Sequence, residues 1–288
     1  MTHNRFAIET LNYIWNHPNC RQEQLQAIAR FIGWQFYKRL THRSLDIPLV
    51  DDLKLRCYPD SAAASAVLYC GLFDRNEMTF LLRYLREEDA FLDLGANIGV
   101  YTLLAASKID SGKIYSIEAL PKNYARLQEN IALNQLHQVT SYDSAIADRV
   151  GTVRLELAEG DCMPHLVEET EIAENAIAVP CETLNHLFNN KPPSNLKLAK
   201  MDIEGAELLA LKGATSLLEQ HCPPVWLVEI VYQDRELVEW FENYGYTLYE
   251  YSAETHQLSP VSLGCVSGKN VLAIATSALE FVRHRLSR

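Results

Sequence analysis

The chain has 288 residues, and its 26 basic and 37 acidic residues give a formal net charge of −11 with the histidines neutral. Apolar residues make up 48% of the chain and charged residues 22%, a composition that argues against a disordered, collagen-like or repeat protein. Because proteins bind nucleic acid through clustered Lys and Arg, the acidic balance argues against a nucleic-acid substrate.

The first 48 residues are expected to form a helical extension or cap, with a break at Pro18. Five apolar residues recur at three- and four-residue intervals and predict one apolar stripe: Leu25, Ile28, Ile32, Phe36 and Leu40. Such a stripe needs a partner, and a homodimer through these helices is one expectation. Five basic residues and one acid from Cys20 to Arg43 also suit an anionic substrate or a membrane surface, although a solvated helix face explains the same charges.

Residues 49–288 are expected to form one domain in which strands and helices alternate. The elements predicted up to residue 145 are a strand at 53–58, a helix at 77–86, a strand at 90–94, a helix at 98–107, a strand at 113–118, a helix at 121–136 and a strand at 139–145. This alternation predicts an α/β protein with a mostly parallel sheet and helices on both faces.

Residues 151–179 interrupt the alternation with several acids, Gly160 and Pro164, and we expect a hairpin followed by an insertion there. Alternation resumes with a strand at 196–201, a helix at 206–219, a strand at 225–231, a helix at 235–243 and strands at 246–251 and 270–276.

Seven cysteines are scattered along the chain without a Cys-x-x-Cys spacing, which is typical of buried thiols in a reducing compartment. The first residues lack the features of a signal peptide, and no apolar run approaches the ~20 residues that span a bilayer. We therefore expect a cytoplasmic protein without a transmembrane segment.

The turn at residues 93–99 follows a predicted strand and opens a predicted helix, the place where ligands bind in open α/β sheets. Gly95 permits a tight turn and a close approach of backbone to ligand, and Gly99 lets the helix pack close to the strand. Glu118 ends the next predicted strand, where an acid can accept both hydroxyls of a ribose. The pattern predicts a nucleoside-containing ligand.

Two other nucleotide signatures match less well. Asn97 replaces the second glycine of the dinucleotide fingerprint, where the backbone makes room for a pyrophosphate. Residues 264–269 have too few positions between their glycines for a P-loop. S-adenosylmethionine has no pyrophosphate, and Asp93 beside the turn suits its charged amino-acid end.

Several further motifs share an order and a spacing with a known family. Over roughly 68–229, the chain resembles the successive motifs of the FkbM family of S-adenosylmethionine-dependent methyltransferases. The matching motifs are residues 93–99, Tyr101-Thr102, Ile117-Glu118, residues 130–134 and residues 200–207. The resemblance implies a Rossmann-like, seven-stranded class I methyltransferase sheet. It also implies methyl transfer to a hydroxyl of a sugar, glycan or secondary metabolite.

The sequence departs from the family pattern at two places. Glu118 is followed by Ala119 where many members have proline, a change that concerns the adenine wall rather than the ribose contact. Residues 71–74 resemble the family's first motif, but Phe73 and Asp74 replace its aromatic and acidic residues. A family role for the tyrosine hydroxyl or the longer glutamate carboxylate of this motif is therefore not carried over to this chain.

The predicted cofactor site consists of the glycine-rich turn and the ends of the first three strands of the alternating region: Asp93, Gly95, Ala96, Asn97, Gly99, Thr102, Glu118, Asp143, Ser144 and Ala145. Asp143 can bond the exocyclic amine of adenine, or it can be a turn aspartate that bonds the local backbone.

Methyl transfer from a sulfonium needs little beyond alignment and exclusion of water, but a hydroxyl acceptor must also lose its proton. Asp202, at the end of a predicted strand, is the first candidate for the base, and an N-cap of the following helix is the alternative. Glu204 and Glu229 are further candidates at neighbouring strand ends. No spacing indicates a metal site, and Lys200 is expected to pair with a carboxylate.

Three classes of function stay open at this point. The motif series predicts an O-methyltransferase with a small-molecule or carbohydrate acceptor. An N-methyltransferase would use the same cofactor, and an oxidoreductase with a nucleotide cofactor could use the same kind of sheet. A non-catalytic protein that associates through its first helices is the third class.

Overall fold

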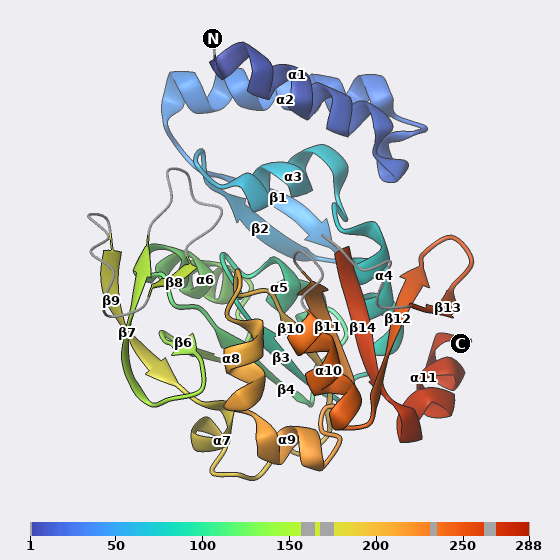
Figure 1. Cartoon of the computed structure of the whole chain (residues 1–288). Helices are drawn as coiled ribbons and strands as arrows, with labels where there is room; N and C mark the ends of the chain where they lie inside the picture. Colours follow the sequence, from blue (N-terminus) through green and yellow to red (C-terminus); the bar gives the residue numbers. More distant parts are fainter. Residues whose placement is uncertain (1, 157–164, 168–175, 231–234, 262–268, 288) are drawn as a thin grey trace.

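The computed structural model describes residues 2–156, 165–167, 176–230, 235–261 and 269–287 (Figure 1). Its main feature is an eight-stranded sheet with the strand order β13-β12-β14-β11-β10-β3-β4-β5. The strand bounds are Ala90–Leu94 for β3, Lys113–Ile117 for β4, Val139–Tyr142 for β5, Leu196–Met201 for β10, Val225–Ile230 for β11, Tyr246–Ser252 for β12, Gln257–Pro260 for β13 and Lys269–Ala275 for β14.

The expected Rossmann-like seven-stranded sheet is confirmed, and β13 adds an unpredicted strand at its edge. Strands β11, β10, β3, β4 and β5 run parallel, whereas β14 runs against both of its neighbours. The chain moves outward in one direction from β3 and in the other direction from β10. The carboxyl ends of these two strands therefore border the crevice in which this kind of sheet binds ligands.

Helices cover both faces of the sheet because the strands bury side chains on both sides. On β11, Val225 and Leu227 pack with α4, α5 and α11, whereas Trp226 and Val228 pack with α8, α9 and α10. The helix bounds are Arg75–Tyr84 for α4, Val100–Ala106 for α5, Pro121–Leu133 for α6, Leu184–Leu187 for α7, Glu207–Lys212 for α8, Thr215–Glu219 for α9, Arg235–Asn243 for α10 and Leu279–Leu286 for α11.

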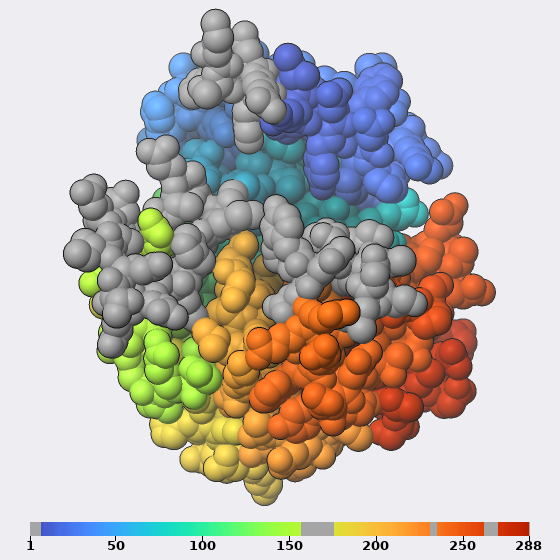
Figure 2. All heavy atoms as spheres, viewed as in Figure 1, coloured from blue at the N-terminus to red at the C-terminus, as the bar shows by residue number. Residues whose placement is uncertain are grey.

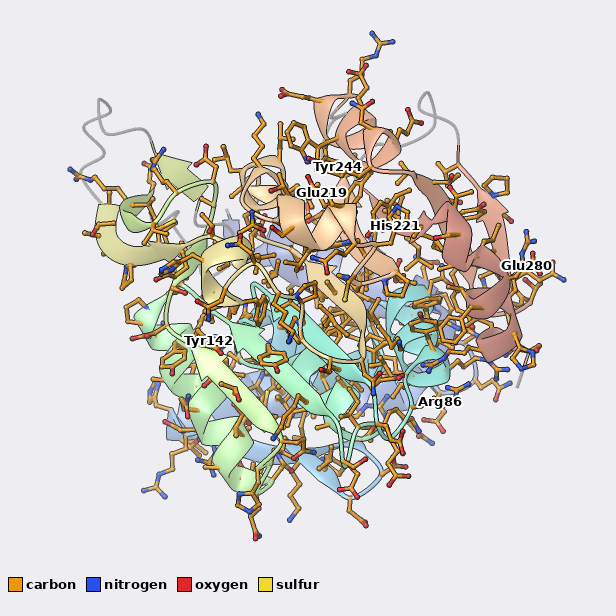
Figure 3. The ribbon with its side chains drawn as sticks, turned by 90° about the horizontal axis from the view of Figure 1, so that it is seen from below. Arg86, Tyr142, Glu219, His221, Tyr244 and Glu280 are labelled. Atoms are coloured by element: carbon orange, nitrogen blue, oxygen red, sulfur yellow. The ribbon has the colours of Figure 1, made fainter. Side chains whose placement is uncertain are left out.

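The single helix expected at 206–219 is divided into α8 and α9. Gly213 ends α8, and a Cβ at this position would lie 2.1 Å from the carbonyl oxygen of Ala147. The break therefore lets the chain approach the neighbouring backbone. His221 follows α9, and its Nε2 lies 3.0 Å from the carbonyl oxygen of Tyr244, on the underside of the molecule (Figure 3).

The strand expected at 139–145 is also divided, since its last residue belongs to a second sheet with the order β6-β9-β7-β8. Its strands are Ala145–Ile146 for β6, Gly151–Glu156 for β7, His165–Val167 for β8 and Ala176–Glu182 for β9. The expected hairpin and insertion at 151–179 thus extend to residue 182. The parts of this insertion at 157–164 and 168–175, like residues 264–268, lie outside the described residues.

The N-terminal extension lies at one end of the molecule (Figure 2). It comprises α1 (Thr2–Asn16), the short 3-10 helix η1 (Pro18–Cys20), α2 (Gln24–Thr41), β1 (Leu45–Val50), β2 (Leu53–Cys57) and α3 (Ala62–Cys70). The expected boundary at residue 48 falls inside β1, where Pro48 pairs with Lys54 in a two-stranded sheet. Among the described helices, none is both long and apolar enough to cross a membrane.

The apolar stripe predicted on α2 faces outward for most of its length. Leu25, Phe36 and Leu40 are 77%, 73% and 85% exposed, and only Ile28 packs on the core. The buried face instead carries Trp34, whose Nε1 donates a hydrogen bond of 3.1 Å to Ser65 Oγ on α3. The indole of Trp34 thus has a polar partner on the buried face of the helix, whereas the apolar face that carries Leu25, Phe36 and Leu40 is exposed.

Asn130 of α6 and Asn134, the C-cap of this helix, join strand β2 to α6. Asn130 Oδ1 accepts a 2.8 Å hydrogen bond from Arg56 N, and Asn134 Oδ1 accepts one of the same length from Lys54 N. Asn130 is fully buried, and its Nδ2 donates to the carbonyl oxygen of Ile98 in the glycine-rich turn. One side chain therefore joins the N-terminal extension to this turn.

We expect Asn130→Ala to lower the free energy of unfolding by about 2 to 4 kcal/mol, because two buried backbone groups lose their partner. Denaturant titration measures this loss. Gln128→Ala, on the exposed side of the same helix, is the control and should change stability by less than about 0.5 kcal/mol. Equal effects of the two changes would contradict the fastening role of Asn130.

Candidate active site

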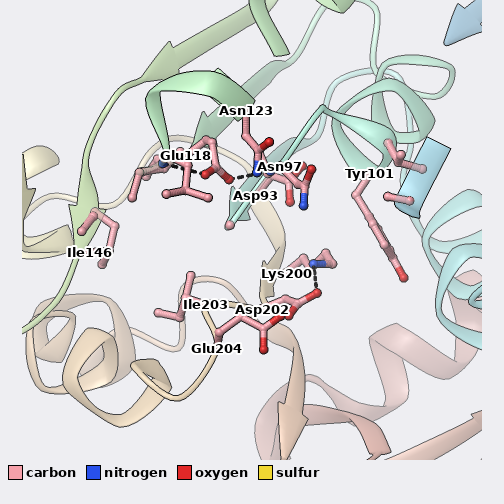
Figure 4. A pocket seen from close by; sticks show the side chains of 18 of the residues that line it. Asp93, Asn97, Tyr101, Glu118, Asn123, Ile146, Lys200, Asp202, Ile203 and Glu204 are labelled. Carbon is pink, nitrogen blue, oxygen red and sulfur yellow. Dashed lines mark hydrogen bonds and ion pairs between the residues drawn. The ribbon is translucent and has the colours of Figure 1, made fainter. Parts of the chain in front are cut away.

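A cavity of about 220 Å³ lies at the carboxyl ends of β3, β4 and β10, where the strand order reverses (Figure 4). Nine of the residues expected at the site line it: Asp93, Gly95, Ala96, Asn97, Glu118, Ser144, Ala145, Asp202 and Glu204. Four other expected residues do not line it: Gly99, Thr102, Asp143 and Glu229.

Glu118 is the buried acid at the end of β4. Its Oε2 accepts a 2.7 Å hydrogen bond from Asn97 N, and its Oε1 accepts a 2.8 Å bond from Leu120 N. Burial raises the pKa of Glu118 to about 7. Because each carboxylate oxygen has a second lone pair, Glu118 holds the turn and can still accept hydroxyl groups from a ligand.

Asp93 is completely buried at the end of β3. Its Oδ2 accepts a 2.6 Å hydrogen bond from Thr102 Oγ1, while its Oδ1 is buried without a partner. Burial raises the pKa of Asp93, and nearby Lys200 opposes this shift. Thr102 therefore positions Asp93 from outside the cavity, and the free oxygen is an acceptor for a cationic or hydrogen-bonding ligand.

The two glycines of the turn have steric roles that differ from the expected ones. Gly95 has a φ of +75°, and a Cβ on it would lie 1.9 Å from the carbonyl oxygen of Asp202. Gly95 thus lets its own backbone lie against Asp202 at the end of β10, in addition to the expected approach to a ligand. Gly99 has a φ of +94°, and its Cβ would lie 2.7 Å from the side chain of Leu127 on α6, so it serves helix packing.

A further wall of the cavity is formed by residues that come shortly after β5 in the sequence. Ser144 is buried with its Oγ unpartnered, and Ala145 lies beside it. Asp143 is exposed and does not line the cavity, so its expected contact with adenine stays a prediction.

The opposite wall carries the one ammonium group that lines this cavity. Lys200 Nζ lies 2.9 Å from Asp202 Oδ2, as the strand periodicity predicted, and 4.7 Å from the centre of the Tyr101 ring. Burial alone would lower the pKa of Lys200, but Asp202 and Asp93 raise it above its ordinary value. Lys200 is therefore held as a buried cation.

The three candidate bases have different surroundings. Asp202 is not an N-cap, because α8 begins at Glu207 and its capping position is Ala206. Glu204 has a φ of +52°, and burial followed by the charges of Asp202 and Glu229 raises its pKa to about 7. Burial and then Asp202 also raise the pKa of Glu229, which lies outside the cavity.

Sequence reasoning did not assign Asn123, Ile146 or Tyr101 to the cavity that they line. Asn123 lies in the first turn of α6 and is buried, a tertiary property that no local sequence pattern reveals. Phe73 and Asp74 lie in the segment that resembles the family's first motif. Their substitution had placed that segment in doubt, although it does reach the cavity.

The charge of this cavity suits a cationic ligand. Among the residues that the structure describes, five carboxylates and one ammonium line it: Asp74, Asp93, Glu118, Asp202 and Glu204, together with Lys200. S-adenosylmethionine carries a sulfonium and an ammonium against one carboxylate, so it compensates part of this negative excess. The unpartnered oxygens of Asp93 and Ser144 are available to its polar groups.

Comparison with known proteins supports the same cofactor. Residues 93–248, more than half of the chain, match the family model described as the methyltransferase FkbM domain. Methyltransferase sdnD of Sordaria araneosa is 26% identical over 195 residues, which cover 57% of this chain and 74% of that protein.

The similarity to solved structures is low in both sequence identity and TM-score. A putative transferase from Pyrococcus horikoshii has a TM-score of 0.45 at 14% identity, with 81% of this chain and 72% of that chain covered. A putative methyltransferase from Streptococcus mutans in complex with SAH has a TM-score of 0.40 at 9% identity, with 68% and 92% covered. On the family match, this chain belongs to the FkbM methyltransferase family and uses S-adenosylmethionine as its methyl donor.

Proposed function

We propose that the protein is an O-methyltransferase that acts on a hydroxyl of a sugar, glycan or secondary metabolite. The observation that carries this proposal is the place of Asp202, a cavity carboxylate held by Lys200 at a Nζ to Oδ2 distance of 2.9 Å. A hydroxyl acceptor must lose a proton during transfer, and a fixed carboxylate within reach can take it.

The residues of the cavity divide into binding and chemical roles. S-adenosylmethionine supplies the activated methyl group. Glu118 is proposed to accept the ribose hydroxyls and Asp93 to receive the charged methionine end, while Ser144 and Ala145 border the adenine. Asp202 is proposed to accept the proton of the acceptor, and the cavity walls exclude water from the reacting groups.

N-methyl transfer to a small molecule is the alternative within the family, since an amine acceptor needs the same donor. A deprotonated amine is nucleophilic without a base, so a paired carboxylate at the reacting end favours the hydroxyl acceptor. The oxidoreductase alternative loses its basis because the chain belongs to a methyltransferase family.

The exposed face of α2 supports a second proposal, that two copies of the chain pair through their N-terminal helices. Large apolar side chains without a partner mark interaction surfaces.

All five cysteines that the structure describes with side chains are free thiols, which supports the proposed cytoplasmic location.

Transfer of a labelled methyl group tests the function directly. Wild-type protein, labelled S-adenosylmethionine and a small-molecule extract should yield a labelled product, and fragmentation in the mass spectrometer should place the label on oxygen. A label on nitrogen would establish the alternative. Absence of both transfer and cofactor binding would contradict the proposed function.

We expect Glu118→Gln to weaken S-adenosylmethionine binding by about tenfold to a hundredfold, because a charge-assisted hydrogen bond is lost. The pKa of about 7 adds a pH test. Since the ligand favours the ionised carboxylate, wild-type affinity should rise between about pH 6 and pH 8, and the variant should lose this rise. Calorimetry measures both effects, with the exposed Glu239→Gln as the control. A variant that retains the wild-type profile would move the ribose contact elsewhere.

Asp202→Asn should lower turnover by about 10²-fold or more while cofactor affinity stays within a few fold, because asparagine keeps the size but cannot accept the proton. Turnover is measured on the acceptor found by labelled transfer, with the exposed Asp110→Asn as the control. Unchanged turnover would give the role of base to Glu204 or Glu229. Lost cofactor affinity would instead place Asp202 at the methionine end of the ligand.

Phe36→Asp should convert the proposed dimer into a monomer, because a charge replaces an apolar contact at the centre of the α2 face. Light scattering after size-exclusion chromatography measures the mass. A wild-type chain that remains monomeric at every concentration would contradict the dimer, and sedimentation of that monomer with anionic vesicles would assign the face to a membrane surface.

A further inference from the structure

Three side chains that can bind a metal ion meet inside the N-terminal extension. His17 is the N-cap of η1, Cys20 is the last residue of η1, and Cys70 is the last residue of α3. One ligand atom from each side chain lies within 4.8 Å of the other two, and all three residues are buried. None of the three lines the cofactor cavity, so the cluster is separate from the candidate active site.

The local structure explains why these three side chains meet. A 3-10 helix has three residues per turn, so His17 and Cys20 lie on the same side of η1. Asn19 Nδ2 donates hydrogen bonds to the carbonyl oxygens of Cys70 at 3.3 Å and Leu72 at 2.7 Å. These bonds hold the end of α3 against η1, and the cluster is therefore assembled by the fold itself.

The hydrogen bonds of His17 identify which of its nitrogens can bind a metal ion. The backbone N–H of Asn19 donates to His17 Nδ1 at 3.3 Å, so Nδ1 carries a lone pair. The ring proton is then on Nε2, which lies 2.9 Å from the carbonyl oxygen of Phe73 and donates to it. A histidine that binds a metal ion through one nitrogen commonly donates its other N–H to a backbone carbonyl in this way.

The bond from Asn19 N to His17 Nδ1 is the contact that a metal ion would replace. At 3.3 Å it is longer than a typical N–H to acceptor bond. Asn19 is an exposed residue, so water can accept its N–H in place of the imidazole. The lone pair of Nδ1 is therefore available to an ion at little cost.

The ligand set is characteristic of zinc. Two cysteines and one histidine are soft and borderline ligands that Zn²⁺ binds well, whereas Ca²⁺ and Mg²⁺ prefer oxygen. Zn²⁺ at about 2.3 Å from sulfur and about 2.0 Å from nitrogen holds tetrahedral ligands roughly 3.5 to 3.8 Å apart. Because the ligand atoms already lie within 4.8 Å of one another, small side-chain rotations suffice to reach this geometry.

The charge and the oxidation state of the cluster also suit Zn²⁺. Cys20 and Cys70 are free thiols, and two thiolates cancel the charge of one Zn²⁺ ion. A neutral complex avoids the high cost of burying an isolated charge. His17 and Pro18 line a cavity of about 500 Å³, which gives the ion a path to the buried ligands.

We propose that His17, Cys20 and Cys70 bind one Zn²⁺ ion through the imidazole Nδ1 and two thiolates. The two thiol protons pass to solvent when the ion binds. Three protein ligands leave one position of the tetrahedron, which a water molecule takes. The ion fixes η1 to the end of α3, and His17 extends this support to Phe73, a residue of the cofactor cavity.

Titration of the reduced, metal-free full chain with Co²⁺ tests the proposal, because Co²⁺ replaces Zn²⁺ and absorbs visible light. We expect one Co²⁺ per chain, the absorption of a tetrahedral site, a thiolate charge-transfer band, and displacement by Zn²⁺. Cys20→Ser and Cys70→Ser should each weaken Co²⁺ binding by at least about 100-fold. Zn²⁺ should raise the Tm of the wild-type chain but not of these variants.

Cys222→Ser removes a thiol outside the cluster and is the matched control, with wild-type affinity for Co²⁺ expected. If the two cysteine variants do not fold, His17→Gln is the second variant and should also weaken binding. The wild-type spectrum needs no variant. No Co²⁺ binding by the reduced wild-type chain, a spectrum without the thiolate band, or wild-type affinity in the folded cysteine variants would overturn the proposal.

Discussion

The arrangement of the active site depends on one buried ammonium, Lys200 Nζ, among the carboxylates that line its cavity. Lys200 fixes Asp202 by an ion pair, offsets the charge of buried Asp93 and lies over the ring of Tyr101. Removing one member of a buried ion pair leaves an uncompensated charge that costs about 3 to 5 kcal/mol. The remaining negative excess explains why this crevice suits a sulfonium donor, whose own net positive charge compensates part of that excess.

The N-terminal extension takes part in this arrangement rather than only covering it. His17 Nε2 contacts the carbonyl oxygen of Phe73, and Asn19 Nδ2 donates a 2.7 Å hydrogen bond to the carbonyl oxygen of Leu72. These contacts hold the segment whose Phe73 and Asp74 line the cofactor cavity. Residues far in sequence from the methyltransferase motifs therefore support one wall of this cavity.

Sequence reasoning located the elements whose residues carry a local signal. The strand at 90–94, the strand at 196–201 and the helix at 235–243 were predicted at their observed bounds, because apolar runs and helix periodicity are local properties. The stripe on α2 was predicted to need a partner, and most of it lies on the exposed face because the buried face carries Trp34, whose partner Ser65 no local pattern reveals. Asp143 and Gly99 were expected at the ligand, and neither residue lines the cavity. The burial of Ser144 and the packing of α6 depend on contacts between distant parts of the chain, which a local sequence pattern does not show.

A crystal structure of the chain with S-adenosylhomocysteine tests the central claim most directly, because it measures where the reacting sulfur lies relative to Asp202. The account predicts the ribose hydroxyls within hydrogen-bond distance of Glu118, the amino-acid end beside Asp93, and the sulfur facing Asp202 and the wall formed by Phe73 and Asp74. A ligand bound in the reverse direction, or with its sulfur turned away from Asp202, would contradict the account.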